Sequence, residues 1–346
     1  MDNKIVIQAC AGSGKTQLIV NKTKNQKLKF LIITFTDNNR DNLRERILKS
    51  NDNTWPTNVW LTTYYSFLFN FCFKPFFSDK IKAKGILFDS DFRPGKYAKK
   101  NTLPYYLSDK GYFYKARLGA FIIDYCLEDV IKRVEEHFDF LIIDECQDMD
   151  SWDFDLILSF KKACVSLLYV GDFYQHTFST SNDGNKNKNL YENMSNYRAR
   201  FEKEGFSFDD CTLSKSWRCS KSVCSFIENN LGISIKSNKE RDSNVVFIND
   251  EGQIIKILSD SSIAKLHYSN GGLYGENHFN WGEVKGVDNF KDVCILLNKT
   301  TFDYYKSNDL KSLAGLTKNK LYVAITRAHN NVFLIEEEYF KKLNKN

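Results

Sequence analysis

Lys4-Ile-Val-Ile-Gln-Ala-Cys-Ala-Gly-Ser-Gly-Lys-Thr16 is the most informative segment of this 346-residue chain. Its apolar, β-branched start predicts a strand, its small residues predict a loop, and the amphipathic residues that follow predict a helix. Such a loop lets several backbone N–H groups converge on phosphate oxygens, with the positive end of a helix behind them. We therefore predict a nucleotide site built from Ala11, Gly12, Ser13, Gly14, Lys15 and Thr16.

Two residues of this loop have individual expected roles. Lys15 is expected to reach the β- and γ-phosphates of ATP, and the Thr16 hydroxyl is expected to bind Mg²⁺. The strict pattern has glycine where Ala9 stands. A plain glycine turn is the alternative, and the flanking strand and helix patterns argue against it.

A second apolar strand predicts the other half of the metal site. Phe138-Asp-Phe-Leu-Ile-Ile-Asp-Glu145 ends in two adjacent carboxylates. Asp144 is suited to hold Mg²⁺ through its water shell, and Glu145 is suited to orient or deprotonate the attacking water. The alternative is a pair of solvated loop acids, against which the upstream glycine loop argues.

The composition is that of an ordinary globular protein with two domains. Hydrophobic residues make up 42% and charged residues 27%, which excludes bulk disorder, a collagen-like chain and a disulfide miniprotein. A length of 346 residues suits two α/β domains. The formal net charge of +6 permits a polyanionic partner without demonstrating one.

The cysteines and the apolar segments indicate a cytoplasmic protein outside the membrane. The nine cysteines are scattered without a Cys-x-x-Cys pair, so we expect reduced, mostly buried thiols. The sequence begins without a charged-then-apolar signal region. Its most apolar segment, residues 66–77, is interrupted by Asn70, Lys74 and Pro75 and is too short to span a bilayer.

Several motifs resemble those of superfamily 1 helicases of the UvrD/Rep type. Asp144-Glu-Cys-Gln-Asp148 resembles the D-E-x-Q-D signature of that family. The other motifs follow in the family's order, from residue 4 to about residue 335. They are Thr34–Arg40 with Leu43–Ile47 (T-F-T-N-K-A-A…E-M-x-x-R-I), Thr63–Phe67 (T-F-H-S-F), Gly171–Gln175 (G-D-x-x-Q), Ser216–Ser220 (N-Y-R-S), Lys285–Asp288 (K-G-L-E) and Leu321–Ala328 (L-Y-V-A-x-T-R-A).

The resemblance implies two tandem RecA-like P-loop NTPase domains with mostly parallel sheets. The first is expected over residues 1–210, with a reduced insertion at about 74–137, and the second over residues 211–346. Only 67 positions separate Arg218 from Lys285, too few for the large second-lobe insertion of full-length relatives. The chain therefore resembles a minimal form of the family.

The resemblance also implies roles in ATP hydrolysis for individual residues. Mg²⁺·ATP is expected between the two lobes, where Arg218 and Arg327 match the arginines that reach the γ-phosphate. Gln175 matches the glutamine that senses this phosphate, and Asp288 stands where the family has a glutamate at the ribose or cleft. For each arginine, a surface ion pair is the alternative.

Nucleic-acid contacts are implied at a further set of matching positions. Single strands are held through backbone phosphates and through bases stacked on aromatic rings. The matching phosphate-side residues are Thr36, Arg40, Thr63 and Ser66, and the matching aromatic residues are Phe35, Tyr64 and Phe178. For the three aromatic residues, a place in the core is the alternative.

The sequence also departs from the family pattern. The family's adenine-reading glutamine segment is missing before the glycine loop, and Gln8 in the predicted strand is not a substitute, so selectivity for ATP is open. Tyr65 replaces the histidine of T-F-H-S-F, and Thr180 replaces a stacking aromatic. A stacking ratchet of the usual kind is therefore expected to be weakened.

Three functions remain open from the sequence. The leading one is an ATP-dependent translocase or helicase acting on single-stranded or tailed duplex DNA. The second is a DNA-sensing ATPase switch that signals to a partner nuclease without processive unwinding; short UvrD-like proteins occur beside nucleases in bacterial antiphage defence systems. The third is a P-loop NTPase whose hydrolysis is indifferent to DNA.

Overall fold

The chain folds into two compact units. The computed structural model describes residues 3–88, 98–178, 183–287 and 289–343. The first unit comprises Met1–Ile7, Thr16–Gly171 and Ser179–Asp209, and the second comprises Gln8–Lys15, Asp172–Phe178 and Asp210–Asn346. The glycine loop and the segment after Gly171 thus belong to the unit that holds the C-terminal part of the chain.

The first unit is built on a six-stranded sheet. Its strand order is β3 (Val59–Thr63), β2 (Phe30–Thr34), β6 (Phe140–Asp144), β7 (Ser166–Gly171), β1 (Lys4–Gln8) and β8 (Ser207–Asp209). The pairs β2–β3, β2–β6, β6–β7 and β1–β8 are all parallel. Because parallel strands end at the same edge of the sheet, this arrangement gathers Thr34, Thr63 and Asp144 along one edge.

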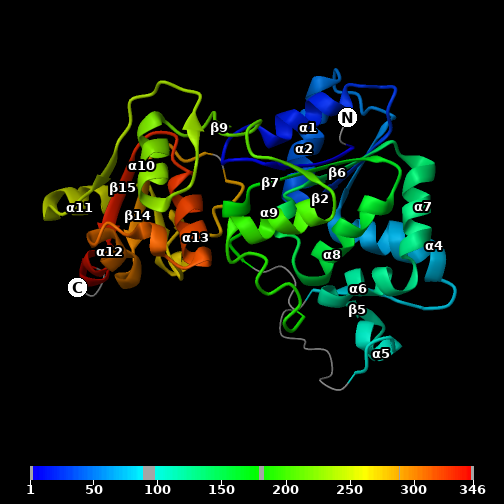
Figure 1. The fold of residues 1–346 in the computed structure, drawn as a ribbon. Coiled ribbons are helices and arrows are strands. Elements are labelled where there is room, and N and C mark those ends of the chain that lie inside the picture. Colours follow the sequence, from blue (N-terminus) through cyan, green and yellow to red (C-terminus); the bar gives the residue numbers. More distant parts are fainter. Residues whose placement is uncertain (1–2, 89–97, 179–182, 288, 344–346) are drawn as a thin grey trace. The chain divides into compact units, whose positions relative to one another are not determined.

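Helices cover this sheet and form the insertion. Figure 1 shows α1 and α2 on one side of the strands and α6 and α8 on the other, as right-handed crossovers require. The described part of residues 74–137 adds short elements, two helices of 11 residues each and a two-stranded parallel sheet, β4–β5. The elements are α1 (Lys15–Thr23), α2 (Asp37–Ser50), α3 (Tyr64–Ser66), the π-helix η1 (Phe67–Phe73), α4 (Lys74–Phe77), β4 (Gly85–Leu87), α5 (Leu103–Tyr106), β5 (Tyr112–Tyr114), α6 (Lys115–Tyr125), α7 (Leu127–His137), α8 (Ser151–Ser159) and α9 (Met194–Lys203).

The second unit has a five-stranded sheet of its own. Its order is β11 (Val245–Phe247), β15 (Val332–Glu336), β14 (Val293–Leu297), β12 (Ala264–His267) and β13 (His278–Asn280). All four pairings are parallel. The predicted α/β class with mostly parallel sheets is therefore confirmed in both units.

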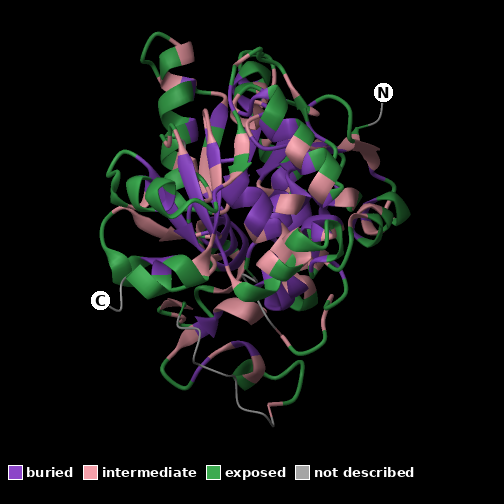
Figure 2. Ribbon diagram, turned by 90° about the vertical axis from the view of Figure 1, so that its left-hand side faces the viewer, coloured by how far each residue is buried: buried purple, intermediate pink, exposed green. Residues whose placement is uncertain are grey.

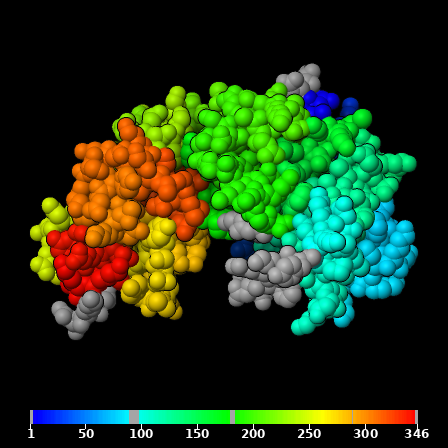
Figure 3. Space-filling view, turned by 60° about the horizontal axis from the view of Figure 1, so that its bottom comes forward, coloured from blue at the N-terminus to red at the C-terminus, as the bar shows by residue number. Residues whose placement is uncertain are grey.

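Five helices accompany this second sheet. They are α10 (Lys221–Leu231), α11 (Glu251–Ser259), α12 (Lys299–Lys306), α13 (Gly315–Ile325) and α14 (Glu337–Leu343), with a short β9–β10 pair at Lys215–Ser216 and Lys236–Ser237. The Ser220 side chain caps α10 by accepting from the Val223 N–H, and Gly232 ends the helix in the left-handed region. The red C-terminal residues lie against the orange segment that contains α12 (Figure 3).

The buried residues concentrate on the strands and on the inner faces of the helices (Figure 2). In the second unit, one cluster joins strand residues such as Ile295 to Tyr322 of α13 and to Cys10 and Ala11 of the glycine loop. All nine cysteines are free thiols, and only Cys164 and Cys211 are exposed. Among the helices of the described ranges, none has the length and apolar character needed to cross a bilayer.

Candidate nucleotide site

The glycine loop needs its glycines because two of its residues take left-handed backbone angles. Gly12 has φ +69° and Gly14 has φ +95°. An added Cβ on Gly12 would lie 2.6 Å from the Cβ of Arg218 and 3.0 Å from the Ser216 hydroxyl. Glycine therefore allows Arg218 to lie directly beside the loop.

Three hydrogen bonds fasten the loop within the second unit. The Cys10 N–H donates to the Leu213 carbonyl at 2.9 Å, and the Trp217 N–H donates to the Gly12 carbonyl at 2.8 Å. The Ala11 N–H donates to the Tyr322 hydroxyl at 2.9 Å. The loop is thus held in place by residues from two distant parts of the chain.

The Ser13 hydroxyl is the polar group of this loop whose partner is missing. It is buried and has no hydrogen-bond partner among the described residues. A buried hydroxyl without a partner is costly, and an oxygen of a bound phosphate would satisfy it. The loop therefore fits a phosphate chain in its donor chemistry as well as in its backbone conformation.

The two arginines expected to act on the γ-phosphate differ in burial. Arg218 is half-buried, and its guanidinium donates to the Thr326 carbonyl at 3.4 Å. Arg327 is 1% exposed, and its guanidinium donates to the carbonyls of Val323 at 3.2 Å and Val287 at 3.1 Å. Arg327 is therefore part of the core as well as a candidate catalytic group.

The Cys219 thiol is influenced by the charges of both arginines. Its pKa is lowered, first by a hydrogen bond from Cys224 and then by the charges of Arg218 and Arg327 among other causes. Cys10, at the start of the glycine loop, has its pKa raised instead, mainly by burial and then by the charge of Asp172. The two thiols thus differ in the direction of their pKa shifts, and the Cys10 thiol stays protonated.

Gln175 is held in place through Asp172, which is buried at the start of its segment. The carboxylate of Asp172 accepts from the Gln175 side chain at 2.7 Å and from the Tyr322 hydroxyl at 3.1 Å. It also accepts from the Gln8 side chain at 3.3 Å. Gln8 thus supports this segment through its side chain.

The predicted metal ligand and base lie at the end of β6 in the first unit. The Asp144 carboxylate is buried and accepts from the Glu145 N–H at 3.1 Å. Glu145 takes left-handed angles, φ 56° and ψ 44°, which is a strained conformation for a residue with a side chain. Its carboxylate accepts from the Gln147 side chain at 2.5 Å. This left-handed turn comes directly after the buried Asp144 carboxylate.

Gly171 allows the segment after β6 to pack against the end of β7. An added Cβ there would meet the Gln147 side-chain oxygen and would lie 2.8 Å from Cys146 Sγ. No cluster of three or more His, Cys, Asp or Glu side chains suited to a metal occurs within the described ranges. The oxygen donors of Asp144 and Thr16 fit Mg²⁺, which in nucleotide sites takes one or two carboxylates, water and substrate phosphates.

Most predicted nucleic-acid residues lie at the carboxyl ends of β2 and β3. Thr36 is exposed and caps α2 by accepting from the Asn39 N–H at 3.2 Å. Arg40, also partly exposed, forms ion pairs with Asp37 at 2.6 Å and with Asp41 at 2.8 Å. Their backbone and side-chain positions leave both residues accessible from solvent.

Thr63 and Ser66 flank a pair of buried tyrosines. The Thr63 hydroxyl donates to the Ser66 hydroxyl at 2.9 Å. Tyr64 is only 1% exposed, and its hydroxyl donates to Asp153 at 2.9 Å. In this structure Tyr64 is therefore a core residue rather than an exposed stacking face.

Phe35 and Phe178 differ from Tyr64 in accessibility. Phe35 is half-buried, with its ring centroid 6.3 Å from that of Tyr64. Phe178 belongs to the second unit and is 48% exposed. Asp288, expected at the ribose or the cleft, lies outside the described residues.

Trp217 is a candidate site residue that the sequence motifs did not identify. Its side chain is 57% exposed, and its Cδ1 lies 4.0 Å from where a Cβ on Gly14 would be. An exposed indole beside a phosphate loop offers a surface on which a nucleobase can stack. Its place in Ser216–Ser220, where the family motif N-Y-R-S has tyrosine, is the signal that could have identified it from the sequence.

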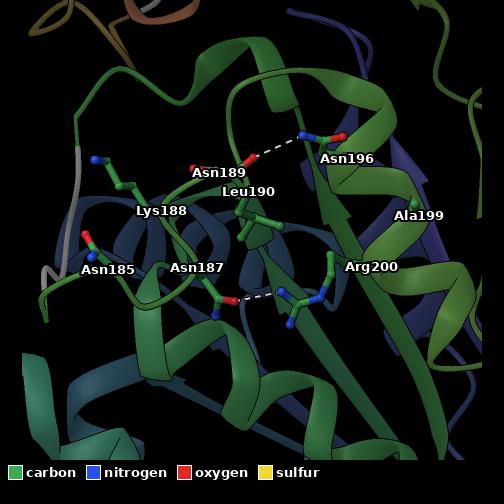
Figure 4. A pocket seen from close by; sticks show the side chains of 8 residues that line it. All are labelled: Asn185, Asn187, Lys188, Asn189, Leu190, Asn196, Ala199 and Arg200. Carbon is green, nitrogen blue, oxygen red and sulfur yellow. Dashed lines mark hydrogen bonds between the residues drawn. The ribbon is translucent and has the colours of Figure 1, made fainter.

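A cavity of about 700 Å³ lies elsewhere in the first unit, between α9 and the segment before it. Figure 4 shows its polar lining, including the hydrogen bond from Arg200 to Asn187. None of the predicted site residues lines it. The lining residues are Asn185, Asn187, Lys188, Asn189, Leu190, Asn196, Ala199 and Arg200.

Two family models match the chain. Residues 1–180 match the model described as an AAA domain. Residues 117–336 match the model described as the viral superfamily 1 RNA helicase core domain. A comparison with curated proteins found no match.

Among solved structures, two viral proteins are similar over 97% of this chain. The arterivirus nonstructural protein 10 (helicase) in complex with DNA has 11% identity and a TM-score of 0.51, with 61% of its own length covered. The PRRSV helicase has 13% identity and a TM-score of 0.47, with 53% of its length covered. The chain thus spans little more than half the length of these proteins, and the first likeness supports the assignment of the fold.

Proposed function

Since the chain belongs to the superfamily 1 helicases, we propose that it hydrolyses ATP in response to single-stranded nucleic acid and moves along the strand. The close approach of Gly12 to the Cβ of Arg218 carries the proposal, because it sets an arginine beside the phosphate loop. The motifs Asp144–Asp148 and Leu321–Ala328 support the narrower assignment to the UvrD/Rep type. In this assignment the loop residues Ala11 to Thr16 bind the phosphates of ATP.

Thr16 and Asp144 would hold Mg²⁺, to which both residues offer oxygen atoms. The bound ion would neutralise charge on the β- and γ-phosphates. Glu145 would accept a proton from the attacking water, since its carboxylate follows that of Asp144 directly in the sequence. These assignments divide ion binding and water activation between two neighbouring acids.

Arg218, Arg327 and Gln175 would act on the γ-phosphate from the second unit. A guanidinium stabilises the charge that spreads over the transferred phosphoryl group. Gln175 would report the presence of this phosphate to the rest of the protein. Trp217 would stack on the nucleobase. Stacking does not distinguish one base from another, so selectivity for adenine would depend on other contacts.

Single-stranded DNA, alone or as the tail of a duplex, is the proposed partner. Its support is the likeness to the arterivirus helicase whose structure contains DNA. Thr36, Arg40, Thr63 and Ser66 would bind phosphates, and Phe35 and Phe178 would contact bases. Tyr64 would support Phe35 from beneath, because its own ring is buried.

A second candidate function is the DNA-sensing ATPase switch that works with a nuclease. Between Arg218 and Lys285, all of which the structure describes, lie only α10, α11, the short 3₁₀ helix η5 (Gly271–Tyr274) and the short strands β10–β13, with no inserted subdomain. This compactness favours a switch over a processive motor. Unwinding of a tailed duplex by the isolated protein discriminates between the two, because a switch hydrolyses ATP without separating the strands.

The first test is steady-state ATP hydrolysis with no nucleic acid, with single-stranded DNA and with single-stranded RNA. We expect strong stimulation by DNA, abolished in Lys15→Ala and retained in Lys22→Ala, a matched control in the exposed last turn of α1. Stronger stimulation by RNA would correct the choice of polymer. Hydrolysis indifferent to both would contradict the motor and the switch, and no hydrolysis would contradict the ATPase assignment.

A further inference from the structure

Helix α13 connects the glycine loop to the segment that carries Gln175. All three parts belong to the second unit. Asn319 and Tyr322 lie three residues apart on this helix, so their side chains share one face. Both are buried, and both make hydrogen bonds to residues far away in the sequence.

The Tyr322 hydroxyl is the direct link. It accepts from the Ala11 N–H at 2.9 Å and lies 3.1 Å from a carboxylate oxygen of Asp172. Burial and the charge of Asp172 raise the pKa of Tyr322 well above its usual value, so the hydroxyl keeps its proton. Because the Ala11 amide can only donate, the single tyrosine proton is given to Asp172.

Asp172 passes this link on to Gln175. The oxygen of Asp172 that accepts from Tyr322 also accepts from the Gln175 side chain, at 2.7 Å. The other carboxylate oxygen accepts from the Tyr174 N–H at 3.1 Å. The chain Ala11–Tyr322–Asp172–Gln175 is therefore continuous in hydrogen bonds.

Asn319, one turn before Tyr322 in the helix, holds the same segment. Its side-chain amide donates to the His176 carbonyl at 2.9 Å and to the Phe173 carbonyl at 3.4 Å. The turn that carries Gln175 is thus held at both ends by α13. Tyr322 alone also contacts the glycine loop, which distinguishes its role from that of Asn319.

We propose that Tyr322 is a positioning residue that couples the nucleotide state of the glycine loop to the placement of Gln175. The proposal rests on the proposed function, because it takes the loop as the phosphate site. Phosphate binding reorients the N–H groups of the loop, so the bond from Ala11 to Tyr322 differs between the empty and filled states. A difference at one end of a short buried chain biases the arrangement at the other end.

Tyr322→Phe removes only the hydroxyl and keeps the ring packed in the core. The matched control is Tyr169→Phe, which removes another fully buried tyrosine hydroxyl, one that donates to the Ile157 carbonyl at 2.6 Å. Amide hydrogen exchange is followed at residues 10–14 and 172–178 in each protein. The measurement is made without nucleotide and with Mg²⁺·ADP.

In the absence of nucleotide, we expect Tyr322→Phe to increase exchange in both segments, whereas Tyr169→Phe changes neither. Exchange at 172–178 equal to that of the unaltered protein would overturn the proposal, whether or not the protein hydrolyses ATP. With Mg²⁺·ADP, we expect the unaltered protein to become protected from exchange in both segments. We expect Tyr322→Phe to become protected at residues 10–14 only. Equal protection of 172–178 in both proteins would also overturn it.

The two proposals fail in different ways. Absence of protection at residues 10–14 in the unaltered protein would contradict the proposed nucleotide site, while the nucleotide-free comparison still tests Tyr322. In kinetics, Tyr322→Phe should lower the nucleic-acid-stimulated kcat roughly tenfold with KM for ATP within about twofold. If Tyr322→Phe lowers kcat by the same factor in the presence and in the absence of nucleic acid, its role is merely structural and the proposed coupling is overturned.

Discussion

Gly12 and Arg218 lie so close that no side chain fits between their backbones, since an added Cβ on Gly12 would be 2.6 Å from the Cβ of Arg218. The glycine therefore has two functions, one conformational and one spatial. It accepts the left-handed angle of the loop, and it admits the arginine. This relationship allows the two functions to be separated by experiment.

Gly12→Ala is expected to weaken nucleotide binding and to destabilise the fold. A left-handed alanine costs about 1–2 kcal/mol, and overpacking adds about 1–3 kcal/mol. Gly205→Ala is the matched control, because Gly205 has φ +81° and nothing lies within 4 Å of its added Cβ. Urea unfolding and nucleotide titration measure the two effects. Equal losses of stability in the two variants would contradict the close approach.

Glu145→Gln is expected to retain ATP binding and to lower turnover at least about 100-fold, since an amide cannot accept the proton of the attacking water. The Gln147 side chain can still donate to the new amide oxygen, so the local turn is preserved. Single-turnover hydrolysis and nucleotide titration check this. Turnover comparable to that of Glu192→Gln, an exposed control, would exclude Glu145 as the base.

Arg327→Ala and Arg218→Ala are expected to differ in stability while both lower turnover. Arg327 is buried and bonded to backbone carbonyls, so its loss should lower the free energy of unfolding by about 2–4 kcal/mol. Arg218 is half-buried, and its loss should change stability by less than about 1 kcal/mol. Chemical unfolding beside ATPase assays measures both. Equal stabilities would show that Arg327 is not part of the core.

Asp153→Asn is expected to remove one pH-dependent contribution to stability. Burial raises the pKa of Asp153 to about 7, although the hydroxyls of Tyr64 and Tyr65 donate to it. Asp150 also raises this pKa, and Lys115 lowers it. The folded state binds the Asp153 proton more tightly than the unfolded state does. The resulting contribution to the free energy of unfolding is therefore complete below the pKa that Asp153 has in the unfolded chain, and it is lost as the pH rises to about 7.

The check on Asp153 is the difference in the free energy of unfolding between the unaltered protein and Asp153→Asn from pH 5 to 8. The unaltered protein should lose stability relative to the variant as the pH rises, and the difference should level off above pH 7. Taking the difference cancels the contributions of other carboxylates. A difference that stays constant with pH would show that Asp153 is ionised throughout this range.

Trp217→Ala is expected to raise KM for ATP roughly tenfold, in proportion to the loss of one stacked base. Stability should change little, because the side chain is mostly exposed. Trp217→Tyr keeps an aromatic face and should restore most of the affinity. Steady-state kinetics with both variants check the assignment, and an unchanged KM in Trp217→Ala would place the base elsewhere.

The sequence could predict the features that depend on neighbouring residues. The order of strand, glycine loop and helix around Gly12 is local, and so is the pair of acids that ends the strand at Asp144. The two-unit α/β architecture was predictable as well, because strands and helices alternate along the chain. Parallel pairing then brings Thr34, Thr63 and Asp144 to one edge without further information.

Features that depend on tertiary packing could not be predicted from the motifs. Tyr64 matches a position that is expected to stack on bases. The buried carboxylate of Asp153 requires a hydrogen-bond donor, however, and the Tyr64 hydroxyl donates to it from within the core. Arg327 and Arg218 look alike as motif residues, but only the folded unit shows that one is enclosed. The contact from Ala11 to Tyr322 joins residues 311 positions apart, beyond the reach of any periodicity.

That separation has a consequence for biosynthesis. At roughly 5–20 residues per second, a ribosome makes Tyr322 about 15–60 s after Ala11. The nascent glycine loop lacks the arginine beside it until Arg218 is made, and it lacks the hydroxyl that holds it until Tyr322 is made. The nucleotide site is therefore incomplete until Tyr322 and Arg327 have been made, and a nascent chain that ends before them cannot turn over ATP by the proposed mechanism.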